Sequence, residues 1–546
     1  MTALLEVDRL QTSFGEGERA FLAVDGISFQ LNQGKTLVLL GESGCGKSVT
    51  ALSVMRLLPP AGRITGGRVL LRGENLFALP EYAMRTVRGG RIGMIFQEPQ
   101  SSLNPVLSAG QQIGETLKQH KGLKGRARRD RTLELLDAVG IPEPERRIDE
   151  YPHQFSGGMK QRIMIAIALA AEPELLIADE PTTALDVTIQ AQVLRLLRDL
   201  QQKTGMGILF ITHDLGVAYE MGDDVAVMYR GQIVENRPRG PFFHKPEHPY
   251  SQKLFDALPS KAKRDREQAQ RPAAAAAAGG SLLKVTDLKV HFPIRRGVFR
   301  HTVGYVRAVD GVSIEIRKGE TVAIVGESGS GKTTLGKGIL QLLRPTDGEV
   351  IFNGSDLLAL SPRELRRQRS DIQIVFQDPY SSMNPRMMVA DIIMEGMLAQ
   401  GIGRDREDRL ERVDTLLQQV GLEPQHKYRY PHEFSGGQRQ RICIARALAV
   451  EPRLIICDEP TSALDVSVQA QILQLLGDLQ RDLGVAYLFI THNISVVEYL
   501  AHYVAVMYKG VIVEQGPADQ VLYTPQHAYT RELLSAVPRV KTGTGA

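Results

Sequence analysis

The chain has 546 residues, which is too long for one hydrophobic core; domains of about 100 to 200 residues imply several units. Its 43% hydrophobic and 23% charged residues are typical of a globular protein and argue against disordered and fibrous classes. The net charge of +4 is the small difference between 66 basic and 62 acidic residues, so charge alone indicates neither a nucleic acid nor a membrane surface as partner.

The sequence predicts a reduced intracellular protein with at most a peripheral membrane role. The first residues, MTALLEVDRLQTSF, lack the basic, apolar and small-residue regions of a secretion signal. No run approaches the roughly 18 apolar residues that a membrane span requires. The three cysteines, Cys45, Cys443 and Cys457, have no metal-binding spacing.

An apolar run, KTLVLL at residues 35–40, predicts a buried strand of a parallel sheet, and GESGCGKS follows it. This text fits GxxxxGK[ST], in which glycines let backbone amides surround phosphate oxygens, the lysine neutralises them and the hydroxyl binds Mg²⁺. The predicted phosphate-binding residues are Gly41, Ser43, Gly44, Cys45, Gly46, Lys47 and Ser48, with Ser48 also on the metal. The alternative is a glycine-rich turn with no ligand.

Cys45 lies inside this loop and has two interpretations. It is either a tolerated small residue or a thiol whose pKa is lowered at the helix end, so that it is alkylated unless ATP is bound.

Ser156, Gly157 and Gly158 open a predicted helix that ends before Pro173. Its positions Ile163, Ala166, Ile167 and Ala170 fall on one apolar face. The Ser-Gly-Gly turn is either a plain helix cap or an anion site with unmasked amides and a serine hydroxyl. As an anion site it makes sense if it faces a phosphate held by another domain.

The run LLIADE predicts a strand that ends in two carboxylates. Asp179 would lie near the metal and Glu180 would orient the attacking water. The alternative is a solvated strand end. His213 follows Glu180 by 33 residues.

Residues 260–280, SKAKRDREQAQRPAAAAAAGG, predict a linker, either flexible or with a short alanine helix. After it the whole pattern recurs, with Lys47 and Lys332 285 residues apart and Glu180 and Glu459 279 apart, so the chain is a duplicated domain. The second strand is ETVAIV, and His492 again follows its glutamate, Glu459, by 33 residues. The second set comprises Gly326, Ser328, Gly329, Ser330, Gly331, Lys332, Thr333 and Thr334 for phosphate, Thr333 and Asp458 for metal, Glu459 for water, and Ser435, Gly436 and Gly437.

On these motifs each half resembles the nucleotide-binding domain of an ABC ATPase. The resemblance implies an α/β fold with two tandem P-loop ATPase domains, each with a RecA-like parallel sheet, an antiparallel β subdomain and a helical signature subdomain. The predicted domains are residues 1–259 and 281–546. The resemblance also implies that each Ser-Gly-Gly completes the ATP site of the other half, giving an internal pseudo-dimer.

Further roles follow from the same resemblance. Gln97 and Gln377 match the metal-contacting glutamines, Asp186 and Asp465 the D-loop, and His213 and His492 the switch histidine. Phe14 and Phe292 match the aromatic residue that stacks on adenine, although Tyr305 competes with Phe292 and a core role is an alternative for both. Asn493 replaces Asp214 after the histidine, so the two sites are not necessarily equal kinetically.

Several segments resemble the oligopeptide, dipeptide and nickel importers, among them RYPHEFSGG, SSMNPRMM and HPYSQKLFDALPS. Gram-negative bacteria have fused double-ATPase versions for peptides, including the peptide antibiotic microcin C. The resemblance implies two membrane permease subunits, an extracytoplasmic peptide-binding protein and a peripheral place on the cytoplasmic face of the inner membrane, with no nucleic acid. It also implies that the helical segments around 99–115 and 379–395 receive a permease helix, with ordinary helical packing as the alternative. ATP and Mg²⁺ are the expected cofactors, and with no cysteines near the terminal segment no iron-sulfur cluster is expected.

The rival class is a soluble double-ABC ATPase that acts on the ribosome or nucleic acid. Such translation factors typically have DEPTNHLD and a long basic linker, whereas this chain has DEPTTALD, DEPTSALD and a short linker. DNA-repair relatives have coiled-coil or zinc insertions, and sugar-importer fusions have a degraded second glycine loop; neither feature is visible here.

Overall fold

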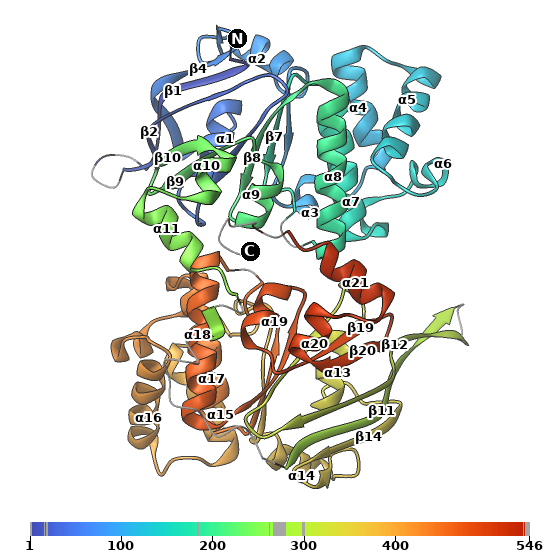
Figure 1. Ribbon diagram of the computed structural model, residues 1–546, viewed down its shortest axis with the longest axis vertical. Coiled ribbons are helices and arrows are strands. Elements are labelled where there is room, and N and C mark those ends of the chain that lie inside the picture. The colour runs from blue at the N-terminus through green and yellow to red at the C-terminus, as the bar shows by residue number, and fades with distance from the viewer. Residues whose placement is uncertain are drawn as a thin grey trace. The chain divides into compact units, whose positions relative to one another are not determined.

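The computed structural model describes residues 3–15, 17, 20–182, 185–260, 263–265, 280–296, 301–462, 464–538 and 540. The chain forms two compact units, one from Met1–Leu185, Ile189–Asp256 and Pro538–Ala546 and the other from Asp186–Thr188 and Ala257–Val537. Each unit contains one four-stranded and one six-stranded sheet with helices between their strands (Figure 1). The predicted α/β class and the duplication are confirmed. Most of the predicted linker, 260–280, lies outside the described residues.

The six-stranded sheet of the first unit has the order β10-β9-β3-β8-β7-β6. Five strands are parallel, and only β10 runs antiparallel to its neighbour. All five residues of β3 and of β7 are buried, as their apolar runs predict. The bounds are β3 Thr36–Leu40, β6 Ile92–Ile95, β7 Leu175–Asp179, β8 Gly207–Thr212, β9 Asp224–Tyr229 and β10 Gln232–Pro238.

The four-stranded antiparallel sheet has the order β2-β1-β4-β5 and packs with β3 and helix α1 into one apolar core. Its strands are β1 Leu5–Phe14, β2 Phe21–Leu31, β4 Gly62–Leu71 and β5 Glu74–Asn75. The helices of this unit are α1 Lys47–Met55, α2 Glu81–Val87, α3 Pro99–Ser102, α4 Ala109–Lys121, α5 Gly125–Ala138, α6 Pro144–Arg147, η2 Pro152–Gln154, α7 Gly157–Leu169, α8 Val187–Thr204, α9 Leu215–Met221, α10 Arg239–His244 and α11 Pro249–Asp256.

The predicted helical segment at 99–115 is not continuous, because an Asn-Pro turn divides α3 from α4. Asn104 Oδ1 accepts a hydrogen bond from the N–H of Val106 across Pro105, at 3.1 Å, and proline has no N–H to continue a helix. The second unit has the same turn, with Asn384 Oδ1 accepting from Arg386 N at 3.1 Å. There α15 begins only at Val389, so the prediction of helix from 379 is wrong for the first ten residues.

The second unit repeats these layers, with sheet orders β12-β11-β14-β15 and β16-β17-β18-β13-β19-β20. Its strands are β11 Ser281–Arg296, β12 His301–Arg317, β13 Thr321–Val325, β14 Asp347–Phe352, β15 Ser355–Asp356, β16 Ile372–Val375, β17 Leu454–Asp458, β18 Ala486–Thr491, β19 Tyr503–Tyr508 and β20 Val511–Pro517. Its helices are α13 Lys332–Ile339, α14 Pro362–Gln368, α15 Val389–Gln400, α16 Arg406–Gln419, η3 Pro424–Tyr428, η4 Pro431–Glu433, α17 Gly436–Leu448, α18 Val466–Leu483, α19 Ile494–Leu500, α20 Ala518–Tyr523 and α21 Ala528–Ser535. The paired strands β11 and β12 are longer than β1 and β2, and they extend beyond the rest of their sheet (Figure 1).

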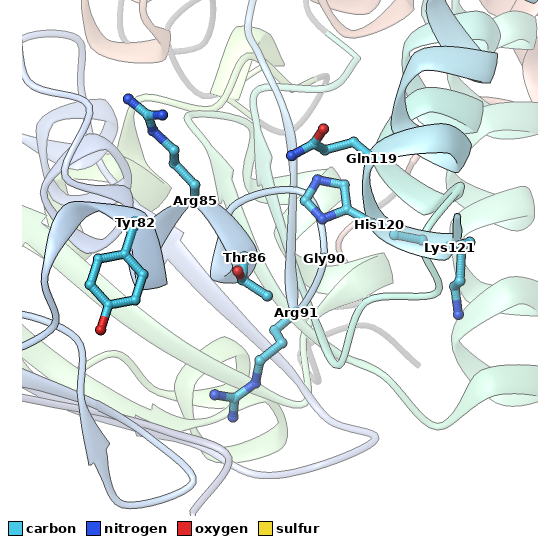
Figure 2. Close-up of a pocket in the computed structure, with 9 residues that line it drawn as sticks. Tyr82, Arg85, Thr86, Gly90, Arg91, Gln119, His120 and Lys121 are labelled. Carbon is cyan, nitrogen blue, oxygen red and sulfur yellow. The ribbon is translucent and has the colours of Figure 1, made fainter. Parts of the chain in front are cut away.

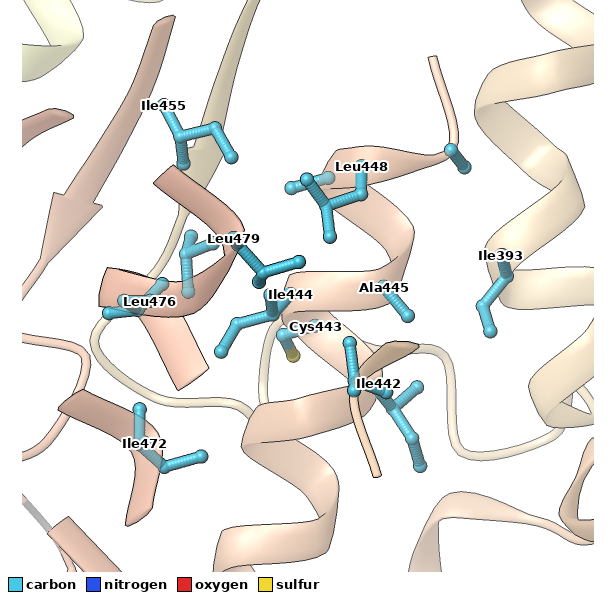
Figure 3. Close-up of a cluster of buried hydrophobic side chains, with 14 of the residues drawn as sticks. Ile393, Ile442, Cys443, Ile444, Ala445, Leu448, Ile455, Ile472, Leu476 and Leu479 are labelled. Carbon is cyan, nitrogen blue, oxygen red and sulfur yellow. The ribbon is translucent and has the colours of Figure 1, made fainter. Parts of the chain in front are cut away.

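Helix α17 is buried deeply in the second unit and carries Cys443 into its core. Figure 3 shows Cys443 among Ile442, Ile444 and side chains of α18 such as Leu476. Burial raises the pKa of the Cys443 thiol, so it behaves as a small apolar side chain.

Among the residues that the structure describes, no helix combines the length and apolarity needed to cross a membrane.

Candidate nucleotide site

The glycine loop of the first unit joins β3 to α1 at the carboxyl end of the parallel sheet. Lys47 is buried, and its Nζ donates to the carbonyl oxygens of Gly41 and Glu42 at 2.8 and 2.9 Å. Gly46 has φ of 108°, and a Cβ there would lie 2.4 Å from the carbonyl oxygen of Ala23. Only glycine fits this position, so backbone geometry determines the residue type at this point of the loop.

The second loop has the same form between β13 and α13. Lys332 Nζ donates to the carbonyl oxygens of Gly326 and Glu327, both at 2.8 Å, and a Cβ on Gly331 would lie 2.0 Å from Ala308 O. Burial lowers the pKa of Lys332. The predicted phosphate-binding residues of each unit therefore lie together in one loop and first helical turn: Gly41, Ser43, Gly44, Cys45, Gly46, Lys47 and Ser48, and Gly326, Ser328, Gly329, Ser330, Gly331, Lys332, Thr333 and Thr334.

Each loop hydroxyl lies against the predicted metal-side carboxylate. Ser48 Oγ donates to Asp179 Oδ1 at 3.0 Å, and Thr333 Oγ1 donates to Asp458 Oδ1 at 2.9 Å. Burial raises the pKa of Asp179 to about 6 and raises that of Asp458 as well. A buried carboxylate beside a hydroxyl supplies hard oxygen ligands, and these are the ligands that Mg²⁺ prefers.

Glu180 follows Asp179 and is buried, with a glutamine and a histidine on its two carboxylate oxygens. Gln97 Nε2 donates to Glu180 Oε2 at 3.0 Å, and His213 Nδ1 lies 3.1 Å from Oε1. Glu180 also has φ of 46°, in the left-handed region that non-glycine residues seldom adopt. The structure thus brings together residues from β7, from the end of β8 and from the segment after β6.

Glu459 has the same surroundings in the second unit. Gln377 Nε2 donates to Oε2 at 2.9 Å, His492 Nδ1 lies 3.1 Å from Oε1, and φ is 47°. Burial acts to raise the pKa of Glu459, but the His492 hydrogen bond and nearby positive charges outweigh it, so the pKa is lowered overall. The carboxylate form is favoured, as a water-orienting group requires.

The Ser-Gly-Gly turns begin helices α7 and α17, and both serines are helix caps. Ser156 Oγ accepts from Met159 N and Ser435 Oγ from Gln438 N, both at 3.4 Å. Ser156 and Gly157 remain exposed, as do Ser435 and Gly436. Gly158 packs closely against Ile189, because a Cβ at this glycine would lie 2.7 Å from Ile189 Cγ2. Gly437 packs closely against Val468 in the same way, and its Cβ would lie 2.3 Å from Val468 Cγ1.

The two predicted adenine-stacking residues lie in different surroundings. Phe14 is half-buried, and its ring stacks on Phe21 with centroids 5.8 Å apart. Phe292 is 39% exposed on β11 and pairs with Val306 on β12, whereas Tyr305, which is 59% exposed, pairs with Pro293. The D-loop residue Asp465 directly precedes α18.

Two tyrosines next to the phosphate loops were missed. Tyr250 and Tyr529 lie in the terminal segments HPY and HAY, and their hydroxyls reach Glu42 N and Glu327 N. The sequence offered these segments only as a family likeness, and nothing in their spacing indicated the contact.

A separate cavity of about 430 Å³ in the first unit contains none of the predicted site residues. It lies between α2 and the end of α4 and is lined by Tyr82, Arg85, His120 and Lys121, among others (Figure 2).

Comparisons with known proteins match both the duplicated part and the terminal segments. The family model for the ABC transporter matches residues 24–183 and 309–462, and the model for the oligopeptide/dipeptide transporter C-terminal region matches 234–281 and 513–545. The chain is 49% identical to the peptidoglycan transport ATP-binding protein YejF of Agrobacterium fabrum over 534 residues, 98% of this chain and 96% of that protein. It is 48% identical to the glutathione import ATP-binding protein GsiA of Escherichia coli K12 over 558 residues, 98% of this chain and 89% of that protein.

Proposed function

Because this chain belongs to the ABC transporter family, as an ATPase with two such domains and the terminal regions of oligopeptide and dipeptide transporters, we propose that it powers a peptide importer. The observation that carries the proposal is that both units keep a full set of groups: lysine, metal-side carboxylate, and glutamate between glutamine and histidine. The alternative of a soluble ATPase acting on the ribosome or nucleic acid is not favoured by these matches.

In the proposed mechanism Lys47 gives up its hydrogen bonds to the loop carbonyl oxygens and binds the phosphates of ATP instead. Ser48, Asp179 and Gln97 would hold Mg²⁺, which neutralises phosphate charge when it is bound. Glu180 accepts a hydrogen bond from the attacking water and orients it, while His213 holds the glutamate and the terminal phosphate in register. Lys332, Thr333, Asp458, Gln377, Glu459 and His492 do the same in the second unit.

We further propose that each Ser-Gly-Gly turn contacts the nucleotide of the other unit, so that ATP favours a closed pair and hydrolysis releases it. This population shift would move two permease subunits. The exposed serine hydroxyls and neighbouring amides support this role, since they are available to an anion. The chain would then act at the cytoplasmic face of the membrane, one copy per transporter.

The cargo we propose is a short peptide or a molecule that contains one. Glutathione, named for one relative, is a tripeptide, and peptidoglycan, named for another, contains peptide stems. Selection of the cargo would rest with the permease and with an extracytoplasmic binding protein.

Uptake by a strain that lacks this gene tests the proposal. Labelled glutathione, dipeptides and a muropeptide are each expected to compete for one system that the wild-type gene restores, and two permease subunits should co-purify with the chain. Unchanged uptake of all three, together with co-sedimentation with ribosomes, would refute it.

A further inference from the structure

In each unit the terminal helix sends a tyrosine back to the phosphate loop. Tyr250 on α11 accepts a hydrogen bond from Glu42 N at 3.3 Å, and Tyr529 on α21 accepts one from Glu327 N at 3.2 Å. Both tyrosines lie in the matched C-terminal regions of oligopeptide and dipeptide transporters. The contact is made twice in one chain, between residues 208 and 202 positions apart. A chance contact would not recur so closely.

The first tyrosine is held from three sides. Its ring packs on Tyr229 at the end of β9, with centroids 4.2 Å apart. The buried Glu235 carboxylate on β10 accepts from the N–H groups of Glu247 and His248, at 2.9 and 3.1 Å. His248 Nδ1 in turn accepts from Tyr250 N at 3.2 Å, which fixes the start of α11. The terminal segment is therefore tied to the strand next to β3, which leads into the phosphate loop.

The second unit repeats the arrangement bond for bond. Tyr529 packs on Tyr508 with centroids 4.3 Å apart, Glu514 accepts from Gln526 N and His527 N, and His527 Nδ1 accepts from Tyr529 N at 3.2 Å. Pro249 of the first copy is Ala528 here, and both are the first residue of their helix. The exchange is harmless because the N–H that proline lacks has no partner within the helix at that position.

The tyrosine hydroxyls remain protonated at neutral pH. Burial, with the negative charge of the nearby glutamate, raises the pKa of Tyr529 to about 12 and that of Tyr250 above its ordinary value as well.

The loop residue between tyrosine and lysine explains what the contact does. Glu42 is held at its N–H by Tyr250 and at its carbonyl by Lys47, and Glu327 is held likewise by Tyr529 and Lys332. A lysine that turns to phosphate gives up the carbonyl, but this exchange does not require the tyrosine bond to the N–H to break, because the two bonds use different atoms of the glutamate. A loop that keeps its shape through this exchange loses less conformational freedom on binding.

We propose that Tyr250 and Tyr529 are positioning residues that keep the phosphate loops in their nucleotide-binding shape while the lysines change partners, so the C-terminal region sets nucleotide affinity. The inference rests on the proposed nucleotide sites but assigns the terminal helices a role within the ATPase itself.

The test compares hydroxyl removal at two neighbouring rings in the full-length chain. Tyr250→Phe with Tyr529→Phe is expected to weaken Mg·ADP binding in equilibrium titration about fivefold, the equivalent of one hydrogen bond, and to raise KM for ATP similarly. The ring packing is retained, so kcat should change less than twofold, and Tm should fall by no more than the loss of one hydrogen bond in each unit implies. The control, Tyr229→Phe with Tyr508→Phe, removes hydroxyls for which no bond to either phosphate loop is seen and should leave affinity as it is.

Equal nucleotide affinity of the Tyr250→Phe, Tyr529→Phe variant and the parent would overturn the inference, as would an equal loss in the control. A purely structural role predicts a lower Tm with unchanged affinity. If the parent binds ADP but does not hydrolyse ATP, the proposed function fails, while the ADP comparison still decides the role of the tyrosines. A parent chain that binds no nucleotide would overturn both.

Discussion

Glu180 and Glu459 are the residues at which sequence and backbone geometry point to the same chemistry. Both have positive φ, at 46° and 47°, and both are buried between an amide and an imidazole. Such a conformation costs about 1 to 3 kcal/mol and persists where the surroundings impose it, commonly at functional sites. The side chain is thereby aimed by its backbone as well as by its two partners.

Glutamine at both positions, Glu180→Gln with Glu459→Gln, is expected to keep ATP binding and lower hydrolysis at least about 100-fold. The amide has the same size but cannot accept a proton from water. Phosphate release and nucleotide binding by the purified chain measure the two effects. Normal phosphate release from the double variant would reject the water-orienting role.

The residue that follows the histidine differs between the two units. Asp214 and Asn493, the residue pair that differs after the histidine, both cap the following helix, accepting from Gly216 N at 2.7 Å and Ser495 N at 3.0 Å. Because the structural role is the same, the exchange does not by itself displace His492.

The buried carboxyl group of Glu235 makes the folding stability of the protein depend on pH. Burial acts to raise its pKa, but hydrogen bonds, including those from the N–H groups of Glu247 and His248, together with Arg237 lower it overall. A carboxyl with a lowered folded pKa stabilises the protein above its unfolded pKa, and that contribution is lost as pH falls through the folded value. Glu235→Gln should therefore lower stability by about 1 kcal/mol at pH 7.

The stability difference between Glu235→Gln and the parent should begin to shrink as pH falls below about 4.5, the unfolded pKa of a glutamate, and should vanish once pH passes the lower folded pKa, where Glu235 is neutral like the glutamine. Thermal unfolding at pH 7 and pH 4 measures it, with Glu514→Gln as the matched variant of the second unit. A difference that grows in acid would contradict the assigned sign.

At the scale of elements, α7 and α17 each begin with the Ser-Gly-Gly turn that the sequence left between two interpretations. The structure has both serines as helix caps, and the same serines remain exposed. Capping alone does not exclude an anion site, because the amides of the first turn stay available.

Aspartate separates the two roles. It caps helices as well as serine does, but its charge repels a phosphate. Ser156→Asp with Ser435→Asp should therefore leave Tm nearly unchanged and abolish ATP hydrolysis. Ser156→Ala with Ser435→Ala, the reference for lost capping, should cost about 1 kcal/mol per helix. Full ATP hydrolysis by the aspartate variant would show that the two serines act only as helix caps.

The elements nearest to the phosphate loops were predicted best. The apolar runs at 35–40 and 320–325 became β3 and β13, and the helix after each Ser-Gly-Gly appeared as α7 and α17. Local patterns specify these because buried parallel strands and glycine loops tolerate few residue types. The Asn-Pro turn after α3 is also a local feature, but the continuous helical segment expected there rested on the family resemblance and not on the residues of the turn.

At the scale of the whole molecule, the contacts that could not be predicted are those between distant parts of the chain. The metal-side pairs followed from motif recognition, although Ser48 and Asp179 are 131 positions apart. The bond from Tyr250 to the loop had no motif to mark it, and left-handed glutamates cannot be inferred from residue type. Duplication makes the motifs specific, because each one occurs twice in the same chain.

Inactivating one unit tests whether the units work together, as we propose. Lys332→Ala should leave much less than half of the ATPase activity, although Lys47 and its surroundings are intact. If the two sites worked independently, each would contribute separately to ATP hydrolysis, and about half of the ATPase activity would remain. Phosphate release by Lys332→Ala, by Lys47→Ala and by the parent distinguishes the two cases.

All three thiols of the chain are buried: Cys45 is 7% exposed, Cys443 1% and Cys457 0%. Thiol-directed spectroscopic probes should consequently react little with Cys443 and Cys457, whose thiol pKa values are raised by burial, so a cysteine placed on the surface of each unit can carry a spin or fluorescent label once the reactivity of Cys45 has been measured with and without ATP. Distances between such labels, followed with and without ATP, would test whether the two units close on nucleotide as proposed.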